Sequence, residues 1–437
     1  MKINEKFEKK HRREKIVQFG EGVFLRGFAD VFFQMLNDEN LTEAGVVLVK
    51  PRRSEKPGMF DKLKEQDGMY THIEQGIKDK NKTVVKRKTD VIERLINPYE
   101  DYESYISLAK NADIRVIISN TTEAGIVYKK EKYKENEANE GFPAKLCALL
   151  YKRYKLKLDG FYIIPCELID NAGDTLKKII LQHADDWNLG DDFKKFVCEK
   201  NKFYNTLVDR IVTGFPENEK LDLEYEDEAV NTSEIYHLWV LSGERSLFDV
   251  LPFDKSGLNI LISDDLDMYH ERKVRILNGL HTCLAPHGLL CGFESVGQCV
   301  EDKKMNDYLC AVRDEITASL DMDKKMLSKY AESVFERFSN PYIYHRLQAI
   351  SLNSISKFKT RVLPSLKEYK RKFNKKAKTL SFAFYELLKL YRSGMANDTD
   401  EMINIIKTSS DKEIMQNKEL WGESIEEYIE IRQGEEK

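Results

Sequence analysis

The sequence predicts an α/β protein, with a Rossmann-like, doubly wound N-terminal domain followed by a mostly α-helical C-terminal domain. Short apolar runs typical of buried strands alternate with helical patterns in the first half of the chain. This alternation is typical of a mainly parallel sheet covered by helices. From about residue 235 strand patterns become rare and amphipathic helical patterns dominate. We therefore expect domains at residues 1–235 and 236–437, divided after the acidic stretch 221–228.

The predicted strands of the N-terminal half are short and apolar. They cover residues 16–19, 45–50, 84–95, 114–120 and 161–166, and a helix is expected over 24–36. The expected helices of the C-terminal half cover residues 271–286, 305–319, 323–337, 342–355, 379–392 and 411–432. We expect partial disorder in the basic segment up to Lys15.

Composition limits the classes of function. The chain has 437 residues, of which 41% are hydrophobic and 33% charged, and its formal net charge is -4. This balance gives no electrostatic reason to expect a nucleic acid or an acidic membrane as partner. The first residues are too polar for a signal peptide. Seven scattered cysteines without a Cys-x-x-Cys pair indicate reduced thiols, and we expect a cytoplasmic protein without a metal site.

Two glycines directly follow the first predicted strand and open the first predicted helix. Gly20 and Gly22 permit a tight turn and the close approach of a pyrophosphate, and the helix N-terminus offers N–H groups. Leu25 holds the place of the third glycine of the usual fingerprint, and Gly27 comes later. The pattern favours a dinucleotide site. The alternative is a tight turn without a ligand.

The second predicted strand ends in cations where NAD-specific proteins usually place an acid. Lys50, Arg52 and Arg53 stand there. Taken alone, these cations favour NADP. The competing interpretation is a solvent-exposed end of a strand.

A lysine, an amide and an imidazole share one broad face of the predicted helix 271–286. At about 100° per residue, Asn278 and His281 lie about 60° apart, and Lys273 lies about 80° from His281. Such a set suits proton transfer at an alcohol, with Lys as acid/base, Asn holding an oxyanion and His orienting a hydroxyl. The alternative is a surface helix with a capping or core histidine.

Several segments together resemble the polyol-specific long-chain dehydrogenases, the mannitol dehydrogenase family. They comprise residues 18–27, 67–71, 119–125, 205–212 and 337–341, together with Lys273, Asn278 and His281. Within the family, residues 165–170 and 350–364 most resemble the members that reduce ketohexuronates. The resemblance extends from about residue 15 to beyond residue 390.

The resemblance implies a metal-independent, NAD-linked oxidoreductase that acts on a small sugar acid. It implies that Lys273 is the catalytic acid/base, that Asn278 belongs to the oxyanion site and that His281 orients the substrate. Polyol-oxidising relatives carry a second oxyanion asparagine two residues after a cysteine that corresponds to Cys166. Leu168 stands there, and the nearest amide is Asn171. The cofactor-binding residues expected on the same ground are Phe19, Gly20, Gly22, Phe24, Arg26, Asn120, Thr122 and Glu123.

A basic cluster follows in the region of the expected substrate helix. Lys357, Lys359 and Arg361 suit the carboxylate of a sugar acid. We therefore expect a ketohexuronate as substrate, tagaturonate first, reduced to the aldonate altronate. A solvated helix face is the alternative. A phosphate would suit the same cations, so a mannitol-1-phosphate or other polyol dehydrogenase stays open, as does a non-catalytic dinucleotide-binding sensor. The sequence does not indicate an oligomeric state.

Overall fold

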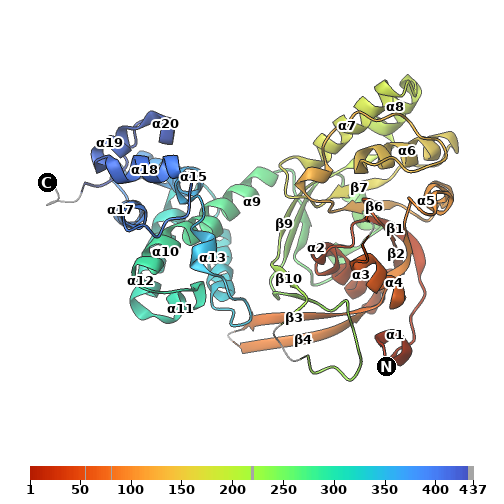
Figure 1. Cartoon of the computed structure of the whole chain (residues 1–437), viewed down its shortest axis with the longest axis horizontal. Coiled ribbons are helices and arrows are strands. Elements are labelled where there is room, and N and C mark those ends of the chain that lie inside the picture. The colour runs from red at the N-terminus through yellow and green to blue at the C-terminus, as the bar shows by residue number, and fades with distance from the viewer. Residues whose placement is uncertain (55, 80, 218–220, 432–437) are drawn as a thin grey trace. The chain divides into compact units, whose positions relative to one another are not determined.

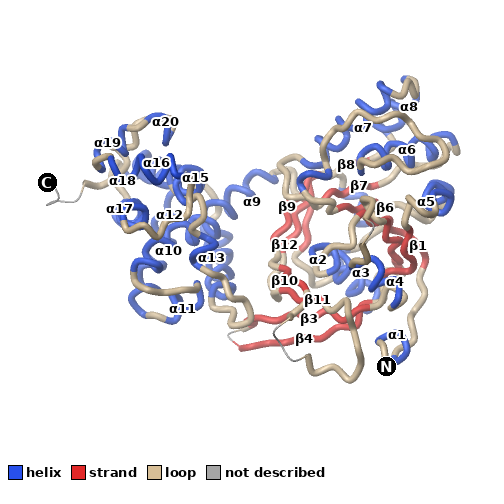
Figure 2. Tube along the Cα trace, in the orientation of Figure 1, coloured by secondary structure: helices blue, strands red, loops and turns tan. Residues whose placement is uncertain are grey.

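The computed structural model describes residues 1–54, 56–79, 81–217 and 221–431. The chain forms two compact units. The N-terminal unit comprises Met1–Gln75 and Thr83–Leu266, and the C-terminal unit comprises Gly76–Lys82 and Asp267–Lys437. Figure 2 shows that strands gather in the N-terminal unit, whereas the residues after 266 are mostly helical.

The N-terminal unit is built on a six-stranded parallel sheet (Figure 1). The strand order is β5-β2-β1-β6-β7-β8. This is the order 3-2-1-4-5-6 of the Rossmann fold, so the predicted fold class is confirmed. The order reverses between β1 and β6, where ligands bind at the carboxyl ends of the strands. The strands are β1 (Arg13–Phe19), β2 (Ala44–Val49), β5 (Ile92–Ile96), β6 (Val116–Ser119), β7 (Tyr162–Pro165) and β8 (Lys202–Phe203).

Both faces of this sheet are buried, which explains the apolar runs of its strands. Ile16 belongs to one core cluster together with α3 (Ala29–Asp38) and α4 (Met59–Glu65). Val17 and Phe19 belong to the cluster on the other face. That cluster includes residues of α5 (Tyr102–Ser107), α6 (Phe142–Lys155), α7 (Ala172–Asp186) and α8 (Asp191–Glu199).

The expected helix over 24–36 is two helices, α2 (Val23–Arg26) and α3. They are separated at Gly27, where a Cβ atom would lie 2.5 Å from the Val212 Cγ1 atom and 2.9 Å from the Asn231 Nδ2 atom. Gly27 therefore permits close packing against neighbouring strands, rather than serving as the third glycine of the fingerprint.

Two smaller sheets complete the N-terminal unit. A four-stranded sheet has the order β10-β11-β3-β4, and a three-stranded sheet has the order β13-β12-β9. The single strand expected over 84–95 is wrong, because β4 and β5 belong to different sheets and separate after Thr89. The strands are β3 (Tyr70–Lys78), β4 (Asn81–Thr89), β9 (Asn205–Asp209), β10 (Val212–Gly214), β11 (Asn231–Ser233), β12 (Leu238–Ser242) and β13 (Ile260–Ile262).

The division between the units lies later than the expected boundary between residues 235 and 236. β12 pairs with β9 on one side and with β13 on the other. Residues up to Leu266 therefore fold with the N-terminal unit. These strands are short and separated by irregular segments. The sequence pattern therefore did not reveal them, and the boundary was predicted too early in the chain.

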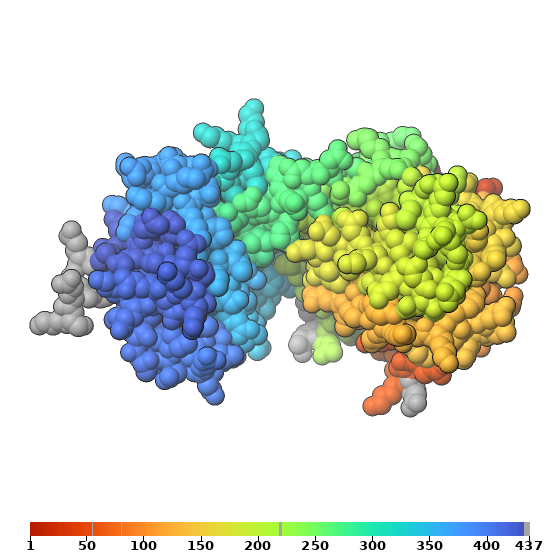
Figure 3. All heavy atoms as spheres, turned by 90° about the horizontal axis from the view of Figure 1, so that it is seen from above, coloured from red at the N-terminus to blue at the C-terminus, as the bar shows by residue number. Residues whose placement is uncertain are grey.

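The C-terminal unit is helical, and α10 packs against α12, α14, α15 and α17. The expected helix over 342–355 is instead two short helices, because Asn353 adopts a left-handed φ of 53° between them. The expected helix over 411–432 is likewise two short helices, which are interrupted at Asn417, and the second ends at Gly422, where φ is 86°. Figure 3 shows the residues near the C-terminus, in the deepest blue, gathered on one part of the surface of this unit. The helices are α9 (Leu266–Arg272), α10 (Gly279–Leu290), α11 (Val296–Glu301), α12 (Lys303–Ser319), α13 (Lys324–Phe338), α14 (Leu347–Ile350), α15 (Ser354–Arg361), α16 (Leu363–Phe373), α17 (Lys378–Arg392), α18 (Asp400–Thr408), α19 (Asp411–Gln416) and α20 (Lys418–Trp421). None of the described helices has the length and apolar character needed to cross a membrane.

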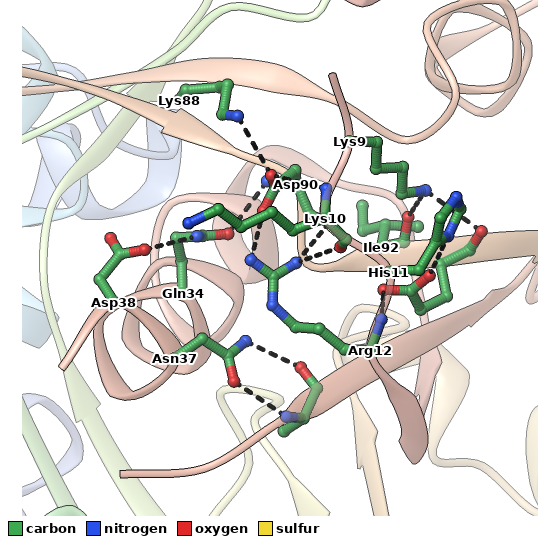
Figure 4. Close-up of polar contacts among 12 residues, drawn as sticks. Lys9, Lys10, His11, Arg12, Gln34, Asn37, Asp38, Lys88, Asp90 and Ile92 are labelled. Carbon is green, nitrogen blue, oxygen red and sulfur yellow. Dashed lines mark hydrogen bonds and ion pairs between the residues drawn. The ribbon is translucent and has the colours of Figure 1, made fainter. Parts of the chain in front are cut away.

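The basic N-terminal segment is ordered, contrary to expectation (Figure 4). Its α1 (Ile3–Lys6) buries Ile3, and the Lys9 ammonium donates to the carbonyl oxygen of Asp67 at 2.6 Å. The Arg12 guanidinium lies 2.7 Å from the Asp90 carboxylate, and the two side chains are 8% and 1% exposed. Arg12 also donates to the carbonyl oxygen of Asp90 at 3.1 Å. The cations that suggested a solvated tail therefore attach it to the N-terminal unit.

We expect the Arg12→Met variant to lose about 1–3 kcal/mol of unfolding free energy at pH 7, because it removes the hydrogen-bonded guanidinium and leaves the buried Asp90 carboxylate paired, among the described residues, with Lys88 alone, at 3.2 Å. Arg12 lowers the pKa of Asp90 against the opposing effect of burial. A depressed folded-state pKa contributes stability above the ordinary carboxyl pKa, and this contribution is lost as the pH falls through the folded-state value. The difference from wild type in urea unfolding should therefore shrink below about pH 4. The exposed neighbour Arg13→Met is the control, and equal losses in both variants would contradict the assignment.

Candidate active site

The turn after β1 requires glycine. Gly20 has a φ of 123°, and a Cβ atom there would lie 2.7 Å from the carbonyl oxygen of Asn120. Gly22 caps α2, and a Cβ atom there would meet nothing within 4 Å among the described residues. Asn120 follows β6, so the turn meets the next loop at the point where the strand order reverses. The open space at Gly22 and the close packing at Gly20 would allow a pyrophosphate to approach the backbone of the turn.

A cavity of about 550 Å³ opens over this turn. Its walls come from residues 20–24, from the loop that begins at Asn120, from residues 140–142 and from Pro51, Arg52 and Met59. A hollow of about 480 Å³ shares some of these walls and adds Glu123 and Leu168. Both lie at the carboxyl ends of the parallel strands, the usual dinucleotide position of this fold.

Most residues expected to bind the cofactor line these two spaces. Gly20, Gly22, Phe24, Asn120 and Thr122 line the larger one, and Glu123 lines the smaller one.

Two expected residues lie elsewhere. The Phe19 ring is buried in the core, 4.9 Å from the Phe142 ring and 6.2 Å from the Tyr105 ring. The Arg26 side chain is fully buried behind the turn, where Nη1 donates to the carbonyl oxygen of Ala229 at 2.6 Å. Their positions in the motif resemble those of cofactor contacts, but burial keeps both side chains out of the cavity wall.

Glu167 holds the loop after β6, a role that the sequence did not reveal. Its buried carboxylate accepts hydrogen bonds from the Ser119 hydroxyl at 3.1 Å, the Thr121 N–H at 2.8 Å and the Thr121 hydroxyl at 2.9 Å. Burial raises the pKa of Glu167 and the hydrogen bonds oppose the rise. An acid immediately after an apolar strand was the available signal, because a carboxylate is buried there only if it is hydrogen-bonded.

Lys145 holds another wall and was also missed. Its fully buried ammonium donates to the carbonyl oxygens of Asn139 and Glu140, at 3.0 and 2.6 Å, and to the Tyr99 hydroxyl at 2.9 Å. Burial lowers the pKa of Lys145 to about 8. The lysine thus fixes the backbone that leads to Gly141 in the cavity wall.

The cations at the end of β2 have different surroundings. The Lys50 ammonium lies 5.3 Å from the centre of the Phe60 ring. The Arg53 guanidinium lies 4.9 Å from the centre of the Tyr99 ring and 3.7 Å from the Glu140 carboxylate. Arg52 lines the cavity.

The expected substrate amide Asn171 lies at the start of α7 in the N-terminal unit. It is exposed, with a left-handed φ of 52°, and its carbonyl oxygen accepts from the Thr175 N–H at 2.9 Å. Asparagine tolerates this conformation better than most residues, which is sufficient reason for its presence. Leu168, at the position of the relatives' second oxyanion asparagine, is 69% exposed.

In the C-terminal unit, a π-helical turn, Lys273–Asn278, connects α9 to α10. In an α-helix, five residues turn through about 500°, which would leave Lys273 and Asn278 about 140° apart. A π-turn bonds residue i to residue i+5 and so brings residues five apart close to one above the other. The π-turn therefore aligns these two side chains better than the expected α-helix does. His281 follows Asn278 by three residues inside α10.

The His281 ring stacks on the Phe338 ring at 4.3 Å and meets the His345 ring edge-on at 5.7 Å. Its Nε2 atom is buried and has no hydrogen-bond partner among the described residues. Burial, followed by the charges of His345, Arg337, Arg361 and Lys357, holds the pKa of His281 well below its usual value. The imidazole is therefore neutral at neutral pH, with a ring nitrogen available to a hydroxyl group.

The three expected substrate cations of α15 separate into a pair and a single residue. Lys357 and Arg361 lie four residues apart, on one helix face, and both contribute to the low pKa of His281. The Lys357 ammonium donates to the carbonyl oxygen of Ile350 at 2.8 Å, and Arg361 donates to the Thr282 hydroxyl at 3.4 Å. Lys359 lies two residues from each and points to a different side of the helix.

Both units of the structure are similar to domains of known proteins. The family model of the Mannitol dehydrogenase Rossmann domain matches residues 14–252, and that of the Mannitol dehydrogenase C-terminal domain matches residues 265–434. A solved structure of D-sorbitol dehydrogenase in substrate-free form has a TM-score of 0.75, with 20% identity, covering 92% of this chain and 87% of the other. At that identity the likeness is one of fold alone.

Curated relatives are more similar in sequence. An altronate oxidoreductase of Bacillus subtilis (strain 168) is 42% identical over 399 residues, which cover 89% of this chain and 82% of the relative. An altronate oxidoreductase of Phocaeicola vulgatus is 39% identical over an alignment that covers 95% of this chain and 92% of the relative. The chain therefore belongs to the mannitol dehydrogenase family.

Proposed function

We propose that this chain is a nicotinamide dinucleotide-dependent oxidoreductase that interconverts tagaturonate and altronate. Its similarity to altronate oxidoreductases over most of its length supports the reaction. The observation that carries the substrate class is the cationic pair of α15, Lys357 and Arg361, whose charges act on His281, a ring whose Nε2 atom has no hydrogen-bond partner in the described part of the chain. A keto acid offers both a carboxylate for the cations and hydroxyl groups for the imidazole.

The proposed chemistry is general acid–base catalysis at the carbonyl oxygen of the substrate. When bound, the dinucleotide supplies the hydride that reduces the ketone carbon. Negative charge then develops on the carbonyl oxygen, and the Asn278 amide stabilises it by hydrogen bonding. Lys273, aligned with Asn278 by the π-turn, donates the proton. His281 accepts or donates at Nε2 to a neighbouring hydroxyl and fixes the orientation of the substrate.

We propose NAD rather than NADP as the cofactor. An extra 2′-phosphate needs cations directed at it. Lys50 lies against the Phe60 ring, and Arg53 lies against the Tyr99 ring and the Glu140 carboxylate. Only Arg52 of the three lines the cavity. We also propose that the protein acts in the cytoplasm, where its seven free thiols would stay reduced.

The experiment that tests the function measures NADH and NADPH oxidation with a panel of ketohexuronates, fructose and hexose phosphates. We expect the highest kcat/KM for tagaturonate with NADH. A higher value for a hexose phosphate would favour the alternative of a sugar-phosphate dehydrogenase, since phosphate suits the same cations. A clear preference for NADPH would assign Arg52 to the 2′-phosphate. Activity with none of the compounds would favour a non-catalytic sensor.

We expect the Lys273→Ala variant to lose about 10²–10⁴-fold in kcat while keeping its affinity for NADH. The lysine acts on the substrate oxygen, whereas the dinucleotide cavity is lined by residues of the N-terminal unit. Stopped-flow turnover and NADH fluorescence titration measure the two quantities. Lys304→Ala, an exposed lysine of α12, is the control. Turnover near that of wild type would contradict the assignment of Lys273.

We expect Lys357→Ala and Arg361→Ala each to raise the KM for tagaturonate by about ten- to a hundredfold, because a charge-assisted hydrogen bond to a carboxylate contributes about 1.5–3 kcal/mol. The KM for fructose should change little. Lys359→Ala is the matched control on the same helix, and its KM for tagaturonate should stay near wild type. Normal KM values in both test variants would identify the pair as a structural feature of α15.

A further inference from the structure

We propose that Gln18 and Arg26 position the glycine turn for pyrophosphate binding by holding two successive carbonyl groups on the buried side of the turn. They are positioning residues, because neither side chain reaches the cavity wall. The inference rests on the dinucleotide site and not on the identity of the substrate.

Gln18 is the first of the two. It lies one residue before the end of β1 on the sheet face of Ile16, and it is 0% exposed. A buried amide costs free energy unless it is hydrogen-bonded. Its Nε2 atom donates to the carbonyl oxygen of Gly20 at 3.0 Å and faces the Asp30 carboxylate at 3.4 Å. Burial raises the pKa of Asp30 to about 7, so the orientation of the amide rests on the Gly20 carbonyl oxygen, which can only accept and therefore requires the nitrogen to face the turn.

Arg26 is the second. Its Nε atom donates to the carbonyl oxygen of Glu21 at 3.2 Å. The guanidinium is itself fixed, because Nη1 donates to the carbonyl oxygen of Ala229 at 2.6 Å and the Tyr70 ring centre lies 5.3 Å away. The Tyr70 hydroxyl in turn donates to the carbonyl oxygen of Arg26 at 2.7 Å. Arg26 therefore acts on the turn through the backbone of Glu21.

The consequence follows from the planarity of the peptide group. In a trans peptide, the N–H of each residue points opposite to the preceding C=O. With the carbonyl groups of Gly20 and Glu21 held on the buried side, the N–H groups of Glu21 and Gly22 point to the other side of the turn. Gly20, Glu21 and Gly22 all line the cavity. Successive backbone N–H groups directed the same way form a concave anion site, which suits a pyrophosphate.

The test compares Gln18→Met with Gln34→Met. Gln34 is a matched control, because it is also buried, but its amide bonds go to Asp38 and to the backbone of Asp90, away from the turn. Calorimetry of the full-length, cofactor-free protein with ADP-ribose measures pyrophosphate binding without turnover. We expect Gln18→Met to weaken ADP-ribose binding about three- to tenfold, the effect of one lost hydrogen bond. Gln34→Met should bind ADP-ribose like wild type, although both variants should lower the Tm.

Steady-state kinetics adds a second readout. In Gln18→Met the KM for NADH should rise by the same factor, while kcat at saturating NADH and the KM for the keto acid stay unchanged. Equal ADP-ribose affinities in the two glutamine variants would overturn the proposal. If Gln18→Met does not fold, Arg26→Lys carries the same test, because Glu21 and Ala229 are bonded by two separate nitrogens of the guanidinium, Nε and Nη1, which the single nitrogen of a lysine does not reproduce. Unchanged ADP-ribose affinity in Arg26→Lys would likewise overturn it. A wild-type protein that binds ADP-ribose but does not reduce tagaturonate would refute the proposed function and leave this inference standing.

Discussion

The contact between Gly20 and the carbonyl oxygen of Asn120 is the constraint on which the cofactor site depends. A side chain at Gly20 would lie 2.7 Å from that oxygen, so the loops after β1 and β6 can approach only through a glycine. The strand order reverses between these two strands, and the reversal separates the helices that leave them. The cavity therefore depends on two features, the reversal of strand order in the sheet and the lack of a Cβ atom at Gly20.

Close packing at Gly20 would not define the shape of the cavity if the loops after β1 and β6 could change conformation. Three segments of the cavity wall are fixed by buried polar side chains behind them: the turn by Gln18 and Arg26, the loop after β6 by Glu167, and residues 139–141 by Lys145. A buried polar group is costly unless it is bonded, so these side chains strongly favour the one backbone conformation that satisfies them. The cavity is thus preorganised, which lowers the entropy cost of binding a flexible dinucleotide.

Sequence patterns predicted the parallel sheet because both of its faces are buried and its strands are continuously apolar. They failed where structure depends on long-range pairing. β12 and β13 are short, and they join the N-terminal unit because β12 pairs with β9 and β13 pairs with β12, so no local pattern placed them there. The charge of the N-terminal segment also led to a wrong prediction. In the sequence Arg12 suggests a solvated side chain, but in the structure it pairs with the buried Asp90 carboxylate. Asn353 separates two helices and Gly422 ends another through left-handed backbone conformations, which propensity alone does not locate.

The candidate catalytic residues show the same limit of prediction from sequence, here in the geometry of a single helical turn. Spacing identified Lys273, Asn278 and His281 on one broad helix face, yet ideal α-helical geometry leaves the lysine and the amide about 140° apart, at opposite edges of that face. The π-turn at Lys273–Asn278 removes that conflict by placing residues five apart near one another. A π-turn is rare, occurs mostly as a single turn inside an α-helix and is frequently found at functional sites. Its position between exactly these two residues is therefore a stronger argument for a shared role than their spacing in the sequence.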